Sequence, residues 1–210
     1  MTTIKLSESA KMTVKALKAA DIWISELSPE SRLFLYGIKP ALAIPVDSTA
    51  SEIFVYNFPS LVEPSNGSAY AVVFQDAYKL HEYVQKAGVA EVNNSWWKGS
   101  RFKVPCKDLG IALGYPPSAC AWFAQYINRV DNNQEGKRMV YYHGMQFVTH
   151  ENLLLENIIW LKENLPVSEH LQSSEYVSLP RRQVDDRIEI VGTFDDVLSS
   201  SLRGEKTNDN

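Results

Sequence analysis

The sequence predicts an α+β fold: a single mixed domain in which a small, mainly antiparallel sheet is packed by several helices, followed by a polar C-terminal tail. Stretches with helical spacing of apolar residues share the chain with short runs rich in β-branched and aromatic residues. These stretches do not alternate regularly, as they would in a doubly wound sheet. The length of 210 residues suits one core with a tail, and the 45% hydrophobic and 22% charged residues are typical of a globular protein.

The N-terminal part is predicted to be helical. Apolar residues recur at helical spacing between lysines from Ser9 to Glu26, which predicts the first helix. Ser28 followed by Pro29 is typical of an N-cap and a first helical position, and Gly37 supplies a stop. Two helices are therefore expected before the first strand.

Three strands are predicted next, because short apolar runs are separated by turn-forming residues. The strands span Ala41 to Val46, Ile53 to Phe58 and Ala69 to Phe74. Pro45 lies inside the first run and has no amide hydrogen to donate to a neighbouring strand. This first strand is therefore expected at an edge of the sheet.

The middle of the chain is predicted to mix helices with one strand. Asp76 is expected to cap a helix that reaches Lys86, and the stretch from Trp96 to Val104 alternates enough to be a strand. A short helix is expected from Leu109 to Leu113. The helix predicted from Pro117 to about Val130 is apolar on nearly all sides, so it is expected to be enclosed within the fold.

The last structured part is predicted to be a strand or hairpin followed by a helix. Val140 to Val148 fits a hairpin around His143-Gly144. Thr149 is expected to cap a helix that reaches Leu165, where Pro166 stops it.

The predicted domain organisation has three parts. Residues 1–167 form the globular α+β domain, residues 168–202 a partly ordered C-terminal extension, and residues 203–210 a disordered tail, which has no apolar side chain. Within the extension, Arg187 to Val191 is a candidate strand and Phe194 to Leu202 a candidate helix.

Composition and missing motifs exclude several classes of protein. The net charge of -4 removes the global positive field of most nucleic-acid binders, and no apolar stretch is long enough to cross a bilayer. The two cysteines lack CxxC spacing and the start does not read as a signal peptide, so a cytoplasmic location is expected. Neither a GxGxxG nor a GxxxxGK[ST] motif occurs, and no cofactor is expected.

Four residues are candidates for catalysis or metal binding. His143, His150 and Glu151 would offer two imidazoles and a carboxylate if a strand end and the next helix start brought them together. The structural alternative places His143 in a turn and the other two in an exposed first helical turn. Cys120 lies in the first turn of a predicted helix, where a thiol becomes a better nucleophile, although its apolar neighbours favour a buried core residue.

Aromatic and basic residues interleave at one place, which is the candidate binding segment. Aromatic faces can stack on a ligand while Lys and Arg hold an anionic group. The alternative is that one tryptophan is anchored in the core. Tyr115, in a tight corner between two helices, is the remaining candidate. The predicted binding residues are Trp96, Trp97, Lys98, Arg101 and Tyr115.

The sequence identifies no particular activity and no family. The leading hypothesis is a non-enzymatic intracellular binding or regulatory protein that acts through the Trp96 to Lys103 segment, with another protein or a small anionic ligand as partner. One alternative is a small metal-assisted or cysteine-dependent hydrolase. Another is a sequence-tolerant nucleic-acid binder, which the acidic composition disfavours and which needs Lys98, Arg101 and Lys103 on one continuous positive face.

Overall fold

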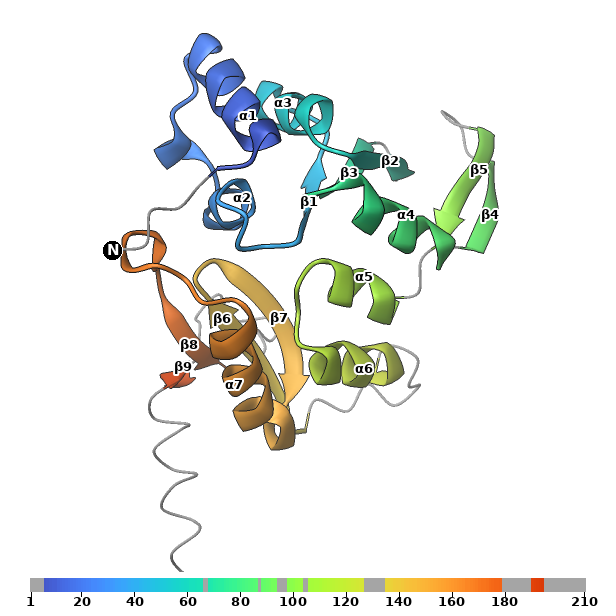
Figure 1. The fold of residues 1–210 in the computed structure, drawn as a ribbon. Coiled ribbons are helices and arrows are strands. Elements are labelled where there is room, and N and C mark those ends of the chain that lie inside the picture. The colour runs from blue at the N-terminus through green and yellow to red at the C-terminus, as the bar shows by residue number, and fades with distance from the viewer. Residues whose placement is uncertain are drawn as a thin grey trace, which may run out of the picture. The chain divides into compact units, whose positions relative to one another are not determined.

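The chain folds into two compact units, Met1–Gly114 and Tyr115–Asn210 (Figure 1). The computed structural model describes residues 6–65, 68–86, 88–93, 98–103, 106–126, 135–178 and 190–194. Helices and antiparallel sheets in these ranges confirm the α+β class, although the described strands form three sheets instead of one. The domain bounds predicted from the sequence, at residues 168 and 203, remain a prediction.

The first helix, α1 (Glu8–Ala19), is shorter than predicted. Ser7 caps it by accepting the amide of Ala10, and it does not continue to Glu26. Asp21 takes a φ of 56°, its amide donates to Lys18 O, and the amide of Ile22 donates to Leu17 O at 2.9 Å. These two bonds form a Schellman motif, which ends a helix because the left-handed residue reverses the chain.

Two predicted helix boundaries are confirmed after this turn. A short 3-10 turn, η1 (Ile24–Glu26), leads into α2 (Pro29–Leu35), whose cap Ser28 accepts the amide of Ser31 at 3.1 Å. Gly37 has a φ of 74°, the left-handed conformation that glycine adopts without steric cost. The serine, proline and glycine signals are local, and they act here as predicted.

A three-stranded antiparallel sheet forms the centre of the first unit. It contains β1 (Ala41–Pro45), β2 (Ser60–Ser65) and β3 (Ser68–Phe74) in the order β1-β3-β2. β1 is an edge strand, as Pro45 predicted. The predicted strand from Ile53 to Phe58 is wrong, because this run lies in the helix α3 (Thr49–Asn57) and the residues just after it.

The helix α3 replaces the predicted strand for two reasons. Ser48 caps it by accepting the amide of Ser51, so a helix start was encoded next to the apolar run. Phe54 and Phe58 are then both buried against Phe34 of α2, with ring centroids 6.1 and 4.8 Å from that ring. Aromatic burial in this arrangement outweighs the β propensity of the segment.

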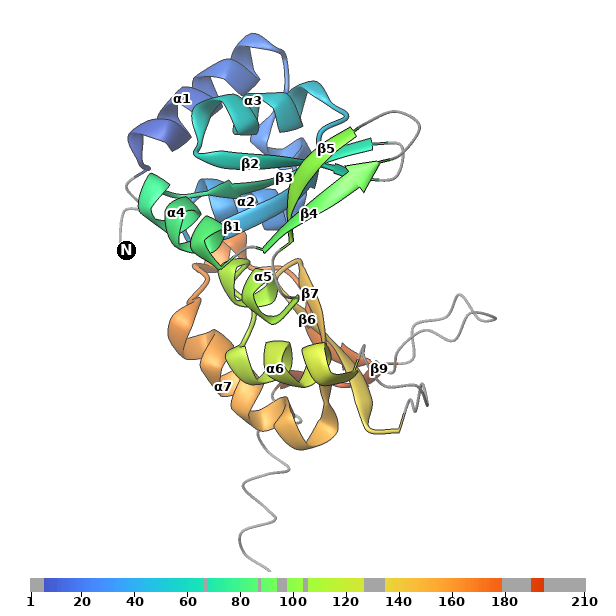
Figure 2. The same ribbon diagram turned by 90° about the vertical axis from the view of Figure 1, so that its right-hand side faces the viewer.

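The sheet of the first unit has helices on both faces. Figure 2 shows α1 and α3 on one side of the strands and α4 (Ala77–Gln85) on the other. Leu42 and Ile44 of β1 lie opposite Val73 and Ala71 of β3, and all four belong to the core shared with α1, α2 and α3. On the other face, Phe74 contacts Tyr83 of α4 with ring centroids 5.2 Å apart.

The end of the first unit contains a hairpin and a short helix. Asp76 caps α4 as predicted, by accepting the amide of Lys79. β4 (Gly88–Asn93) pairs with β5 (Lys98–Lys103), so the strand expected from Trp96 begins at Lys98 and has a partner that the sequence analysis missed. α5 (Cys106–Ala112) corresponds to the short helix expected from Leu109.

A buried lysine joins separate parts of the first unit. The Lys39 side chain is fully buried, and its Nζ donates to Leu113 O at 2.7 Å and lies 2.7 Å from Glu30 Oε1. Burial lowers the pKa of Lys39, while the Glu30 carboxylate acts in the opposite direction. Lys39 therefore links the start of α2 to the end of α5.

The second unit is built on a four-stranded antiparallel sheet. Its strands are β6 (Lys137–Tyr142), β7 (Met145–His150), β8 (Glu175–Ser178) and β9 (Ile190–Gly192), in the order β7-β6-β8-β9. The helices are α6 (Pro117–Tyr126) and α7 (Leu154–Asn164), with the 3-10 turns η2 (Glu151–Leu153) and η3 (Glu169–Leu171). The hairpin around His143-Gly144 is confirmed.

Two helix predictions in the second unit are wrong. Thr149 is a buried residue of β7 and not a helix cap, and α7 begins only at Leu154. Thr149 Oγ1 instead accepts a hydrogen bond from the Asn157 amide at 2.8 Å, which ties β7 to α7. In α6 only Ala119 and Cys120 are buried, so the described part of this helix is not enclosed on all sides.

The C-terminal predictions are tested only in part. β9 begins at Ile190, within the strand expected from Arg187, and Phe194 is helical and buried. Residues 187–189 and the rest of the helix expected to Leu202 lie outside the described residues. The same holds for the tail at 203–210.

Candidate functional site

A tight turn between β6 and β7 places a histidine where asparagine or glycine is usual. His143 has a φ of 47° and Gly144 a φ of 98°, as a two-residue hairpin turn with left-handed central positions requires. Asparagine, aspartate or glycine meets this requirement with little strain. The turn alone therefore does not account for histidine at this position.

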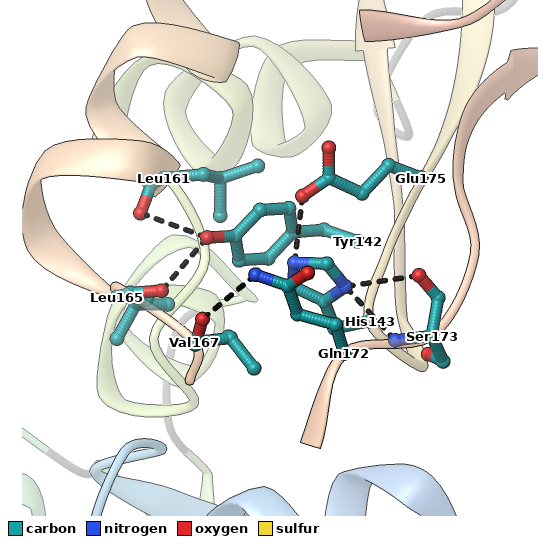
Figure 3. Close-up of polar contacts among 8 residues, drawn as sticks. All are labelled: Tyr142, His143, Leu161, Leu165, Val167, Gln172, Ser173 and Glu175. Atoms are coloured by element: carbon teal, nitrogen blue, oxygen red, sulfur yellow. Dashed lines mark hydrogen bonds and ion pairs between the residues drawn. The ribbon is translucent and has the colours of Figure 1, made fainter. Parts of the chain in front are cut away.

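The His143 imidazole is buried and held at both ring nitrogens (Figure 3). Nε2 lies 2.6 Å from Glu175 Oε1, and Nδ1 lies 3.1 Å from Ser173 O and 3.2 Å from Ser173 N. The pairing of β6 with β8 sets Tyr142 opposite Glu175, and the His143 amide donates to Ser174 O. The sheet therefore brings the Ser173 to Glu175 segment against the turn.

Both protonation states of His143 find complete hydrogen-bond partners. In the neutral tautomer with the proton on Nε2, this nitrogen donates to Glu175 while Nδ1 accepts from the Ser173 amide. In the charged imidazolium, Nδ1 donates to Ser173 O and Nε2 still donates to Glu175.

The Tyr142 side chain lies next to His143. Its hydroxyl donates to Leu165 O at 2.8 Å, and its ring stacks on Phe194 with centroids 5.8 Å apart. Burial, together with the negative charge of Glu175, raises the pKa of Tyr142 to about 12. Tyr142 therefore stays protonated near neutral pH and acts as a donor that holds the end of α7 against β6.

These residues line a polar pocket with a volume of about 510 Å³. The Glu175 side chain is 26% exposed, whereas that of His143 is only 4% exposed, so the carboxylate is the member of the pair that faces the pocket. Lys162 brings a positive charge from α7, and the Gln172 amide donates to Val167 O in the rim. The lining residues are Tyr142, His143, Lys162, Pro166, Val167, Gln172, Ser173 and Glu175.

The predicted catalytic cluster does not assemble. His143 lies in the turn at one end of the hairpin, and His150 pairs with Lys137 at the other end, about 20 Å away along a six-residue strand. His150 Nδ1 accepts the amide of Asn152, and Glu151 forms an ion pair with Arg138. Among the residues that the structure describes, no group of three or more His, Cys, Asp or Glu side chains is placed to hold a metal ion.

Cys120 and Tyr115 both take part in packing within the second unit. Cys120 is buried, and its thiol donates to Tyr115 O at 3.7 Å, a contact that requires the protonated form. Tyr115 is half-buried, with its ring 5.7 Å from Phe147. Burial raises the pKa of the other cysteine, Cys106, and so favours its protonated thiol over the thiolate.

The predicted aromatic and basic segment is described only in its backbone. Trp96 and Trp97 precede β5 and lie outside the described residues. Lys98 and Arg101 belong to β5, with two residues between them, so they occupy positions on opposite faces of the strand. The nucleic-acid alternative, which needs Lys98, Arg101 and Lys103 on one continuous positive face, stays a prediction.

Glu175, Lys162 and Tyr142 line the pocket but were not predicted from the sequence as members of a site. The His-Gly turn was a visible signal, because a bulky residue at a left-handed position calls for an explanation. Nothing local to Glu175 indicates its partner, since the contact depends on the pairing of β6 with β8.

Comparison with known proteins finds no match to a family model, to a curated protein or to a solved structure. None of the helices in the described part of the chain is long and apolar enough to span a membrane. The inference about function therefore rests on the geometry of the sites.

Proposed function

We propose that the second unit is a binding module for a small ligand that carries both an ammonium and a carboxylate group. The observation that carries the proposal is the buried hydrogen bond between His143 and Glu175, both of which line the pocket. His143 occupies a turn position that asparagine would adopt with less strain. Strained backbone conformations are found more often at functional sites than elsewhere.

The charges of the lining support this ligand chemistry. Glu175 is oriented by His143 through one oxygen and is partly exposed to the pocket, where it can accept hydrogen bonds from an ammonium group. Lys162, on α7, supplies the positive charge that would bind the carboxylate group of the ligand. A volume of about 510 Å³ lies within the range of small-molecule sites, which is about 300 to 1,000 Å³.

A binding role, which is also the leading hypothesis from the sequence, is preferred over catalysis for this unit. The histidine and cysteine candidates for a hydrolase are separated or engaged in packing. The Trp96 to Lys103 segment remains a second proposed binding element, with a protein or small anion as its partner. Cys106 and Cys120 are both free thiols, which supports the proposed cytoplasmic location.

The test measures binding of free amino acids to the full chain by thermal shift and calorimetry, with acetate and methylamine as ligands of one charge. At least one amino acid is expected to raise the melting temperature, whereas acetate and methylamine do not. Glu175→Gln and Lys162→Met should each weaken its affinity about tenfold or more, because each removes a charge-assisted contact. Glu169→Gln, on the exposed turn η3, is the matched control and should bind as wild type.

Two results would contradict the proposal. One is that no amino acid in the panel binds. The other is that an amino acid binds with the same affinity to wild type, Glu175→Gln and Lys162→Met, which would place its site elsewhere.

A further inference from the structure

A second pocket lies in the first unit, where the chain turns from α1 into η1. Its volume is about 390 Å³, and it is lined by Val14, Lys18, Asp21, Ile22, Trp23 and Ile24. It shares no residue with the pocket around Glu175. Most of these side chains are apolar, so the pocket offers burial to an apolar group.

The pocket is built on a rigid turn. The Schellman motif at Asp21 fixes the direction of the chain as it leaves α1, through bonds from Asp21 N to Lys18 O and from Ile22 N to Leu17 O. The amide of Trp23 donates to Glu26 Oε2 at 3.3 Å, and the amide of Glu26 donates to Trp23 O at 2.9 Å. The backbone on both sides of the pocket is therefore held before any partner binds, which lowers the entropic cost of binding.

Trp23 is the most conspicuous member of this surface. The residue is 69% exposed, although tryptophan is usually well buried. Exposed tryptophans beside an apolar pocket are typical of the central contacts of protein interfaces, where tryptophan is enriched among the residues that dominate affinity.

Lysines border the pocket along α1. Lys11, Lys15 and Lys18 follow at spacings of four and three residues, so they form one stripe on the helix, and Lys18 itself lines the pocket. Because the charge of Lys11 is offset by its ion pair with Glu8, the positive charge next to the pocket comes mainly from Lys15 and Lys18. Asp21, whose amide donates to Lys18 O, is the acidic group in the lining.

We propose that this surface binds an acidic peptide segment of a partner protein. One apolar side chain of the segment enters the pocket beside Trp23, and flanking Asp or Glu residues face Lys15 and Lys18. The lysine stripe is complementary to acidic residues placed four and three positions apart on a helical peptide. A concave pocket suits an inserted side chain, whereas a membrane surface would be met by a continuous apolar face.

The test selects binders to the full chain from a displayed library of random short peptides. Enriched sequences are expected to combine one large apolar residue with several acidic ones. A synthetic, fluorescein-labelled peptide of this kind should lose at least tenfold in affinity with Lys15→Glu/Lys18→Glu and with Trp23→Ala, as measured by fluorescence polarisation. Lys107→Glu, an exposed lysine on α5, is the control for a charge reversal outside the pocket and should change affinity less than twofold.

The variants are checked for folding before binding is compared. All three change exposed side chains, so their circular dichroism spectra and melting curves should match those of wild type. Enrichment of basic or charge-indifferent peptides overturns the proposal. It is also overturned if Lys107→Glu weakens binding as much as Lys15→Glu/Lys18→Glu, or if vesicles containing phosphatidylserine bind through Trp23 while no peptide does.

Discussion

His143 Nε2 lies 2.6 Å from Glu175 Oε1, and this contact joins the turn of the β6–β7 hairpin to the first residue of β8. The pair is asymmetric in exposure, since the imidazole is nearly fully buried and the carboxylate is partly exposed. Ser173 presents both an amide and a carbonyl to the other ring nitrogen, which holds the ring in one orientation. The geometry suits a carboxylate that is held in place for a ligand.

Substitution of His143 can separate the demands of the turn from those of the ion pair. His143→Asn keeps a residue suited to the left-handed turn but removes the contact with Glu175. The unfolding free energy is expected to fall by only about 1 to 2 kcal/mol, because the Glu175 carboxylate is partly solvated. His143→Ala should be about 1 kcal/mol less stable again, because alanine is strained at a positive φ. Urea unfolding of both variants measures the difference; equal stabilities would show that the turn carries no strain.

Tyr142 is expected to make stability depend on pH in the alkaline range. Its pKa in the folded state, about 12, lies above the ordinary value of 10.0, so the folded state favours the neutral hydroxyl. This contribution is complete below about pH 10 and is lost as the pH rises through about 12. Relative to Tyr142→Phe, the wild type should lose about 2 to 3 kcal/mol of unfolding free energy across this window. Parallel unfolding curves at increasing pH test this, and a constant difference between the two proteins would contradict it.

Asn157 is predicted to be a major stabilising residue of the second unit. It is fully buried, its amide nitrogen donates to Thr149 Oγ1 and its amide oxygen accepts from Ser118 Oγ at 2.6 Å. Asn157→Ala should lower the unfolding free energy by about 2 to 4 kcal/mol, because both partners lose a bond at a buried position. Asn164→Ala, at the exposed end of α7, is the control and should cost about 0.5 kcal/mol or less. A small effect at both positions would show that the buried bonds add nothing.

Two glycines with similar backbone angles should respond differently to alanine. Gly37 has a φ of 74° and no atom within 4 Å of an added Cβ, so Gly37→Ala is expected to cost about 1 kcal/mol from backbone strain alone. Gly136 has a φ of 70°, and its Cβ would lie 2.2 Å from His150 Nε2, so Gly136→Ala should cost about 1 to 3 kcal/mol more. Thermal melts compare the two variants, and the NMR signals of His150 should shift only in the second.

Features encoded within a few residues were predictable from the sequence. The caps at Ser28 and Asp76, the stop at Gly37, the edge position of Pro45 and the His143-Gly144 turn all appear as expected. Each depends on a side chain or a missing amide that acts on its own neighbourhood, so no knowledge of the rest of the chain is needed.

Tertiary contacts decided the features that the sequence analysis placed wrongly or missed. The apolar run from Ile53 satisfies a strand pattern, but packing of Phe54 against Phe34 is realised in a helix. Glu175 became part of the candidate site only because β8 pairs with β6 and its carboxylate meets His143. Hydrophobic burial and strand pairing join residues far apart in the chain, and such partners leave no mark on the local pattern of either segment.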